Sequence, residues 1–229
     1  MVSKMVRHGK AIVDVGTDHA YLPTYLILND IIPNAIAADL REGPLENARQ
    51  TVGKYEVSQK IKLVLSDGLK NLEGCGLTDF VIAGMGGNLI STILSESKWV
   101  EKKGNHFVLQ PQSHAEDLRE YLMSRGFEII REDITSEGRH LYLAMEVTYA
   151  GKVKAFTDEE REENICFGKI WESDSPKKVE FMEAYENRLY VKRNALLLSQ
   201  NDEEAEIERL NRIITKIEDK LENIQEGKL

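Results

Sequence analysis

Short apolar runs alternate with helical patterns over the first 150 residues of the chain. Each run is short and ends at a turn signal, as expected of strands that are buried on both faces of a parallel sheet. The five predicted strands cover residues 11–15, 34–39, 61–65, 79–84 and 106–111. Predicted helices cover residues 20–29, 43–54, 87–97 and 115–126. Because such strand–helix units require right-handed crossovers, we expect a mostly parallel sheet with helices on both faces.

In residues 127–150, apolar and polar residues alternate with a period of two on both sides of "SEGRH". This pattern predicts an antiparallel hairpin after the fifth strand. The first 150 residues are therefore predicted to form one α/β domain.

Helix signals dominate residues 151–229, which we predict to form a second, helical domain. "TDEEREE" begins at Thr157 with a helix N-cap followed by acids that suit the helix dipole. Near the end of the chain, apolar residues are spaced alternately three and four apart, which is typical of a coiled-coil seam. This seam is Ile207, Leu210, Ile214, Ile217, Leu221 and Ile224. A less regular partner face precedes it across "QNDEE" (200–204): Phe181, Tyr185, Leu189 and Leu196. The pattern predicts an antiparallel helical hairpin.

Composition narrows the class of protein. The chain has 229 residues, 41% of them hydrophobic and 30% charged, which is ordinary for a globular protein. No apolar stretch reaches the length of a membrane span, and two cysteines without paired spacing favour a reducing cytoplasm over a disulfide framework. A net charge of −9 argues against nonspecific coating of nucleic acid.

Acidic and small residues stand at the carboxyl ends of successive predicted strands. In parallel sheets these ends meet at one edge, where ligands bind near the reversal of strand order. The residues are Asp14, Gly16, Asp18 and His19 around the end of the first strand, Asp39 at the end of the second, Asp67 and Gly68 after the third, and "AGMGG" (83–87) at the fourth.

This pattern favours a cationic cofactor without phosphate. The first turn reads G-T-D-H-A-Y and lacks the second and third glycines of a dinucleotide-binding turn, and its extra aspartate would repel phosphate. S-adenosylmethionine fits better, because acids can receive its amino group and ribose hydroxyls. Asp39 lies 25 residues after Asp14, close to the spacing of a ribose-binding acid, and Asp67 is placed to accept from the adenine amino group.

Each of these residues also has a structural interpretation. Asp14 is suited to cap the following helix, Gly16 to supply a turn with positive φ, and the glycines of "AGMGG" to allow close packing. Asp18 and His19 suggest a metal ligand pair, but no further ligands at matching spacing accompany them, so no metal site is predicted. The ordered coincidence at consecutive strand ends favours a cofactor site.

Five stretches together carry a family resemblance. "VDVGTDHAYLPTYL", "AADLREGPLENA", "LSDGL", "DFVIAGMGGNLISTIL" and "LQPQSHAEDLREYL" occur in this order within residues 10–150. They resemble the bacterial tRNA (adenine(22)-N1)-methyltransferase family, which also carries a helical C-terminal domain.

The resemblance implies a Rossmann-like class I methyltransferase sheet of seven strands, the last pair a hairpin, and methylation of N1 of an adenine in the D-arm region of tRNA with S-adenosylmethionine as cofactor. Carried onto this chain, it implies cofactor contacts from Asp14, Gly16, Asp18 and His19 in the first loop, Asp39 and Leu40 at the ribose, Asp67 and Gly68 at the adenine, and Ala83, Gly84 and Met85 beneath the methyl group.

Methylation at N1 of adenine requires no strong base, because that nitrogen has an in-plane lone pair. The enzyme's task is in-line positioning and tolerance of the new positive charge. We predict that Asp18 or His19 orients the exocyclic amine and that Tyr21 is a stacking surface; the alternative for Tyr21 is packing in the core. The predicted catalytic set is therefore Asp18, His19 and Tyr21.

We expect the helical domain to contact tRNA through a basic face. The alternative is that these residues are simply the solvent-exposed face of a helix. This face consists of Lys177, Lys178, Arg188, Lys192 and Arg193. We expect a monomer, with a dimer as the alternative, and no membrane partner.

Two other classes of function stay open. A small-molecule methyltransferase would share the cofactor site but close it with helices, and a noncatalytic coiled-coil interaction protein would not bind S-adenosylmethionine. Neither explains "IAGMGG" as well.

Overall fold

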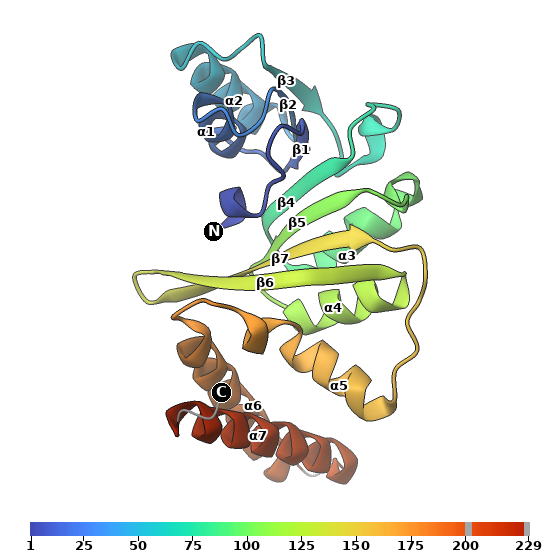
Figure 1. Ribbon diagram of the computed structural model, residues 1–229, viewed down its shortest axis with the longest axis vertical. Coiled ribbons are helices and arrows are strands. Elements are labelled where there is room, and N and C mark those ends of the chain that lie inside the picture. Colours follow the sequence, from blue (N-terminus) through green and yellow to red (C-terminus); the bar gives the residue numbers. More distant parts are fainter. Residues whose placement is uncertain (200–202, 227–229) are drawn as a thin grey trace. The chain divides into compact units, whose positions relative to one another are not determined.

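The computed structural model describes residues 1–199 and 203–226 and contains a seven-stranded sheet in the order β3-β2-β1-β4-β5-β7-β6 (Figure 1). The first five strands are mutually parallel, and β7 and β6 are antiparallel additions at one edge. The strands are β1 (Ile12–Val15), β2 (Ala35–Asp39), β3 (Ile61–Leu65), β4 (Asp79–Met85), β5 (His106–Pro111), β6 (Phe127–Glu137) and β7 (His140–Tyr149). This arrangement confirms the predicted α/β class, the five strands and the terminal hairpin.

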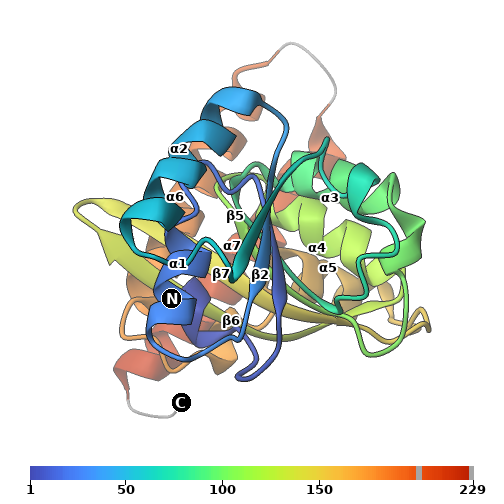
Figure 2. The ribbon, with the colours of Figure 1, turned by 90° about the horizontal axis from the view of Figure 1, so that it is seen from above.

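Helices cover both faces of the sheet. Figure 2 shows α1 and α2 on one side and α3 and α4 on the other. Their bounds are α1 (Tyr21–Leu28), α2 (Glu42–Lys54), α3 (Gly87–Ser95) and α4 (Ala115–Ser124). Three short 3-10 turns add to this part of the chain: η1 (Val2–Lys4), η2 (Lys70–Leu72) and η3 (Lys98–Val100).

The core beneath α1 and α2 is built from small residues of the sheet and branched residues of the helices. Ala35 and Ala37 of β2 are buried and let the helices approach closely, and Leu26 and Ile27 of α1 pack into the same cluster. Burial of these side chains fixes which face of α1 points inward.

The described chain forms two compact units, Met1–Ser173 and Asp174–Leu229. The first includes α5 (Asp158–Phe167) and η4 (Ile170–Glu172), which pack on α4 and β6. The domain boundary expected after residue 150 stays a prediction, and the compact unit itself extends 23 residues beyond it. Thr157 caps α5 and forms a capping box with Glu160, as the sequence predicts for a cap at this position.

A buried ion pair joins α5 to the sheet. The guanidinium Nε of Arg119 lies 2.9 Å from Glu132 Oε1, and both side chains are almost fully buried. Arg119 Nη1 also donates to the carbonyls of Ile165 and Cys166 at the end of α5, at 3.0 and 3.2 Å. The second oxygen of Glu132 accepts the Lys169 N–H at 2.6 Å. The pair thus satisfies helix-end carbonyls that would otherwise be buried without partners.

The second unit contains α6 (Lys178–Leu197) and α7 (Glu204–Gln225). The two helices are antiparallel, because Tyr190 pairs with Glu218 and Lys192 with Glu206. Buried residues are Met182, Tyr185 and Leu189 of α6 and Leu210, Ile213, Ile214, Ile217 and Leu221 of α7. Ile213 widens the buried face beyond the predicted seam, and Ile207 and Ile224 are only half-buried. The helical hairpin is confirmed, whereas coiled-coil packing stays a prediction.

The predicted connection "QNDEE" falls largely outside the described residues, since Gln200–Asp202 are not among them. In the part of the chain that is described, no helix combines the length and apolar character needed to cross a membrane.

Candidate functional site

The loop after β1 turns sharply at the point where strand order reverses. β1 pairs with β2 on one side and with β4 on the other, so its carboxyl end lies at the switch point of the sheet. Gly16 has a φ of +73°, and Asp18 and Ala20 also have positive φ values of 50° and 53°. The N–H groups of Gly16 and Thr17 both donate to the Ala38 carbonyl, at 2.8 and 3.0 Å. The loop is therefore held against the end of β2.

Asp14 is a buried carboxylate beneath this loop. Its Oδ2 accepts a hydrogen bond from the Thr17 hydroxyl at 2.6 Å. The pKa of Asp14 is raised to about 6, mainly by burial and to a lesser extent by the nearby charge of Asp39, against the opposing effect of the Thr17 hydrogen bond. A cation bound close by would restore the ionised form.

Asp39, the expected ribose acid, lies directly beside the first loop. Its two carboxylate oxygens accept N–H groups from Arg41 at 3.0 Å and from Asp18 at 3.4 Å. The neighbouring Leu40 is 61% exposed and forms an apolar rim. The structure thus brings together the residues of the first and second strand ends that the sequence selects.

The end of β3 joins the same edge, but its acid has a partner within the chain. The Ser66 N–H donates to the Asp39 carbonyl at 2.8 Å, which places "SDG" next to β2. Asp67 is exposed and lies 2.6 Å from Lys70 Nζ, which also contacts Glu96 at 3.0 Å. An adenine amino group would therefore compete with Lys70 for Asp67. Gly68 supplies a positive φ of 56° at this turn.

The loops after β4 and β5 are interlocked. Gly84, with a φ of +77°, donates its N–H to Oε1 of the buried Gln110 at 2.9 Å. The Gly87 N–H donates to the Ser113 carbonyl at 2.7 Å, and a Cβ at Gly87 would lie 2.1 Å from the His114 carbonyl oxygen. Close packing against the next loop therefore requires glycine at position 87. Gln110 holds the backbone of Gly84 in place, a role that the sequence does not reveal.

Met85 crosses from β4 to the first loop. A Cβ added at Gly16 would lie 2.1 Å from the terminal methyl group of Met85, so the methionine side chain rests on this glycine. Ala83 precedes it on β4, opposite Gln110 in the register. The residues predicted at the end of β4 thus meet the first loop beside the carboxyl ends of β1 and β4.

The three predicted catalytic residues form an exposed group. The rings of His19 and Tyr21 are stacked, with centroids 5.0 Å apart and planes 7° from parallel. His19 Nε2 lies 3.6 Å from Asp18 Oδ2. Tyr21 is 63% exposed, so the alternative that it packs in the core is wrong.

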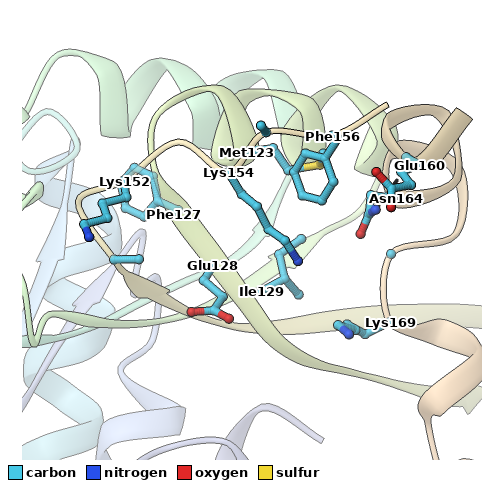
Figure 3. Close-up of a pocket in the computed structure, with 13 residues that line it drawn as sticks. Met123, Phe127, Glu128, Ile129, Lys152, Lys154, Phe156, Glu160, Asn164 and Lys169 are labelled. Carbon is cyan, nitrogen blue, oxygen red and sulfur yellow. Dashed lines mark hydrogen bonds between the residues drawn. The ribbon is translucent and has the colours of Figure 1, made fainter. Parts of the chain in front are cut away.

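A cavity of about 350 Å³ lies elsewhere in the same unit (Figure 3). It is lined by the start of β6 near Phe127, by the segment around Lys154 and Phe156, and by α5. Phe127 of β6 pairs with Tyr149 of β7. The neighbouring residue of β7, Thr148, pairs with His106, the first residue of β5. The cavity therefore lies toward the ends where the parallel strands begin, and we place the functional site at their carboxyl ends instead.

The strand-end site is acidic and suits a cation. It combines the carboxylates of Asp14, Asp18, Asp39 and Asp67 with backbone made accessible by glycine. Within residues 1–199 and 203–226, no group of three or more His, Cys, Asp or Glu side chains is arranged to hold a metal ion. The carboxylates can accept hydrogen bonds from the amino group and ribose hydroxyls of S-adenosylmethionine, and they would repel a pyrophosphate.

Comparison with known proteins identifies the family of this chain. Residues 1–145 match a family model described as a methyltransferase domain. A crystal structure from Streptococcus pneumoniae, described as that of a candidate tRNA (m1A22) methyltransferase, is 31% identical with a TM-score of 0.81 and covers 96% of each chain. The chain belongs to the tRNA (adenine(22)-N1)-methyltransferase family.

One further relative and a second structure of the Streptococcus pneumoniae protein extend the comparison. The tRNA (adenine(22)-N(1))-methyltransferase of Bacillus subtilis is 35% identical over 141 residues, which span 62% of this chain and 59% of that protein. The chain thus matches less than two thirds of the length of this curated family member. A second Streptococcus pneumoniae structure, a complex with S-adenosyl-L-methionine, is 31% identical with a TM-score of 0.79 over 96% of each chain.

Proposed function

We propose that this family member transfers a methyl group from S-adenosylmethionine to N1 of an adenine in tRNA, at position 22 in the D-arm region. The observation that carries the proposal is the acidic strand-end site with an exposed aromatic stack at its mouth. We place the activity in the cytoplasm and in a monomer.

On the cofactor side, each part of the site has a separate task. Asp39 accepts hydrogen bonds from the ribose hydroxyls, and Leu40 lies beside the ribose. Asp14 supplies a buried negative charge near the amino-acid end of the cofactor. Asp67 and Gly68 border the adenine. Gly84 lets the backbone approach the ligand because it carries no side chain, and Gly16 contributes backbone to the first loop while leaving room for the Met85 side chain.

On the substrate side, the residues position the base. S-adenosylmethionine supplies a methyl group on a cationic sulfonium, and adenine N1 carries its own lone pair. Asp18 or His19 accepts from the exocyclic amine and sets the in-plane orientation of the base. Tyr21 offers a ring face for stacking. The surrounding carboxylates stabilise the positive charge that the methylated adenine acquires.

In the second unit, the basic face keeps its proposed role as a tRNA contact, although much of it has partners within the chain. Lys177 lies 2.6 Å from Glu180, and Lys192 lies 2.6 Å from Glu206. The Arg193 guanidinium lies 4.7 Å from the centroid of the Tyr190 ring. Charge reversal at Lys192 would disturb the hairpin as well, so neutral substitution to Gln is the cleaner test of tRNA affinity and its salt dependence.

The decisive experiment incubates the protein with an unmodified tRNA transcript and labelled S-adenosylmethionine, then maps the modified position. We expect 1-methyladenosine at position 22 and no incorporation into a transcript with guanosine there. Asp18→Ala should abolish turnover; full activity with unchanged cofactor affinity in this variant would remove Asp18 from the mechanism.

Two companion assays separate the other classes of function. Incorporation into a metabolite pool, with none into tRNA, would identify a small-molecule methyltransferase. Absence of S-adenosylmethionine binding in calorimetry would identify a noncatalytic protein. Either result overturns the proposal.

A further inference from the structure

Helix α1 exposes aromatic and apolar side chains where a surface helix normally exposes charge. Tyr21 is 63% exposed, Tyr25 51% and Leu28 51%, and their spacing of four and three residues places them on one face. We call these three residues the α1 stripe. The polar residue within the helix, Thr24, is buried instead, and its hydroxyl has no hydrogen-bond partner in the described part of the chain.

The stripe cannot turn inward, because the opposite face of α1 is committed to the core. Leu26 is fully buried and Ile27 is 3% exposed, and both belong to the apolar cluster against β1 and β2. A helix that is apolar on both faces is unusual at a protein surface and indicates that its outer face is covered in a complex.

The α1 stripe is continuous with the proposed site. It begins at Tyr21, whose ring stacks on His19 in the loop after β1. Tyr25 follows one helical turn, about 5–6 Å, farther along the same face. Neither tyrosine hydroxyl has a hydrogen-bond partner among the described residues, so the rings and their hydroxyl groups both face outward.

We propose that the α1 stripe is a stacking surface for unpaired nucleobases of tRNA that flank the target adenine. This inference rests on the proposed function and extends it to Tyr25 and Leu28. The stripe carries no charge, so it is suited to base faces rather than to phosphates, and tyrosine rings accept any base without sequence preference. A base displaced from its stack for methylation leaves neighbours that need a new stacking partner.

The test compares Tyr25→Ala with Tyr25→Phe, Tyr25→Trp and wild type in tRNA methylation kinetics. We expect Tyr25→Ala to raise KM for tRNA about tenfold or more, with kcat at saturating tRNA within about twofold, because each stacked base contributes on this scale. The Phe and Trp variants should keep KM close to wild type. Calorimetry should show an unchanged Kd for S-adenosylmethionine in all variants.

Tyr55→Ala is the matched control, since Tyr55 is a tyrosine of the same unit, 45% exposed just after α2 and outside the stripe. It should leave KM unchanged. An unchanged KM in Tyr25→Ala, or an equal increase in Tyr55→Ala, overturns the inference while the proposed function stands.

Sedimentation of wild type and Tyr25→Ala covers the remaining alternative. A wild-type dimer that Tyr25→Ala converts into a fully active monomer would make the stripe a self-association surface and overturn the inference. Failure of wild type to methylate any tRNA would overturn the proposed function, and the inference with it.

Discussion

Asp14 should make both stability and cofactor binding depend on pH. Its carboxyl is fully buried with a pKa of about 6, compared with an ordinary value of 3.8. Below pH 3.8 the folded and unfolded chains both hold the proton. As pH rises, the unfolded chain loses its proton first, so the free energy of unfolding falls until the folded carboxyl ionises near pH 6. The pKa difference corresponds to about 3 kcal/mol.

The Asp14→Asn variant isolates this effect, because its amide does not titrate and can still accept from the Thr17 hydroxyl. Urea denaturation of both proteins at several pH values gives the difference in unfolding free energy. We expect this difference to move by about 2–3 kcal/mol in favour of the variant between pH 4 and pH 7. Thr17→Val should shift the transition to higher pH, because it removes a hydrogen bond that lowers the pKa of Asp14.

Cofactor binding gives a second readout of the same group. If the ionised carboxylate faces a cation, wild-type affinity for S-adenosylmethionine should fall about tenfold between pH 7 and pH 5, whereas the affinity of Asp14→Asn should stay flat. Parallel pH profiles of the two proteins, in both stability and affinity, would refute the reasoning.

Three further predictions concern the strand ends and the packing of α5. Asp39→Asn should weaken S-adenosylmethionine binding about 10- to 100-fold in calorimetry, because a charged acceptor for the ribose is lost. Gly87→Ala should lower the free energy of unfolding by about 1–3 kcal/mol in urea titration, because the added Cβ would clash with backbone atoms. Gly43→Ala in α2 is the control: its Cβ would contact no other atom, so the free energy of unfolding should rise by about 0.5–1 kcal/mol. Arg119→Met should cost about 3–5 kcal/mol by leaving Glu132 buried without its partner, and a change below about 1 kcal/mol would contradict the assigned role.

The parallel strands could be predicted from sequence because their signals are local. Each is a short apolar run that ends at a turn signal, and the observed strands agree with the predicted ranges to within one residue. The carboxyl-end acids could be predicted for the same reason: once the strands are parallel, topology alone brings Asp14 and Asp39 to one edge.

Contacts between distant residues could not be predicted in this way. Arg119 and Glu132 read as surface charges in their local patterns, yet they form a buried pair that holds α5 on the sheet. The Asp67–Lys70 pair is local, only three residues apart, but it depends on the conformation of the turn before η2, which the sequence pattern does not fix.

The α1 stripe shows a different limit. The periodicity of "YLPTYLIL" predicts a helix but not its orientation, because apolar residues stand on every face of it. Only the packing of Leu26 and Ile27 determines that Tyr25 points outward. Tyr25 is informative because a large aromatic side chain in a helix is usually buried, and here it is exposed.

A crystal structure of the protein with S-adenosylhomocysteine tests the central claim most directly. We predict the ribose hydroxyls within hydrogen-bond distance of Asp39 and the amino-acid end above Gly16, beside the carboxyl ends of β1 and β4. Ligand bound in the cavity beside Lys154 instead, or a ribose far from Asp39, would contradict the account.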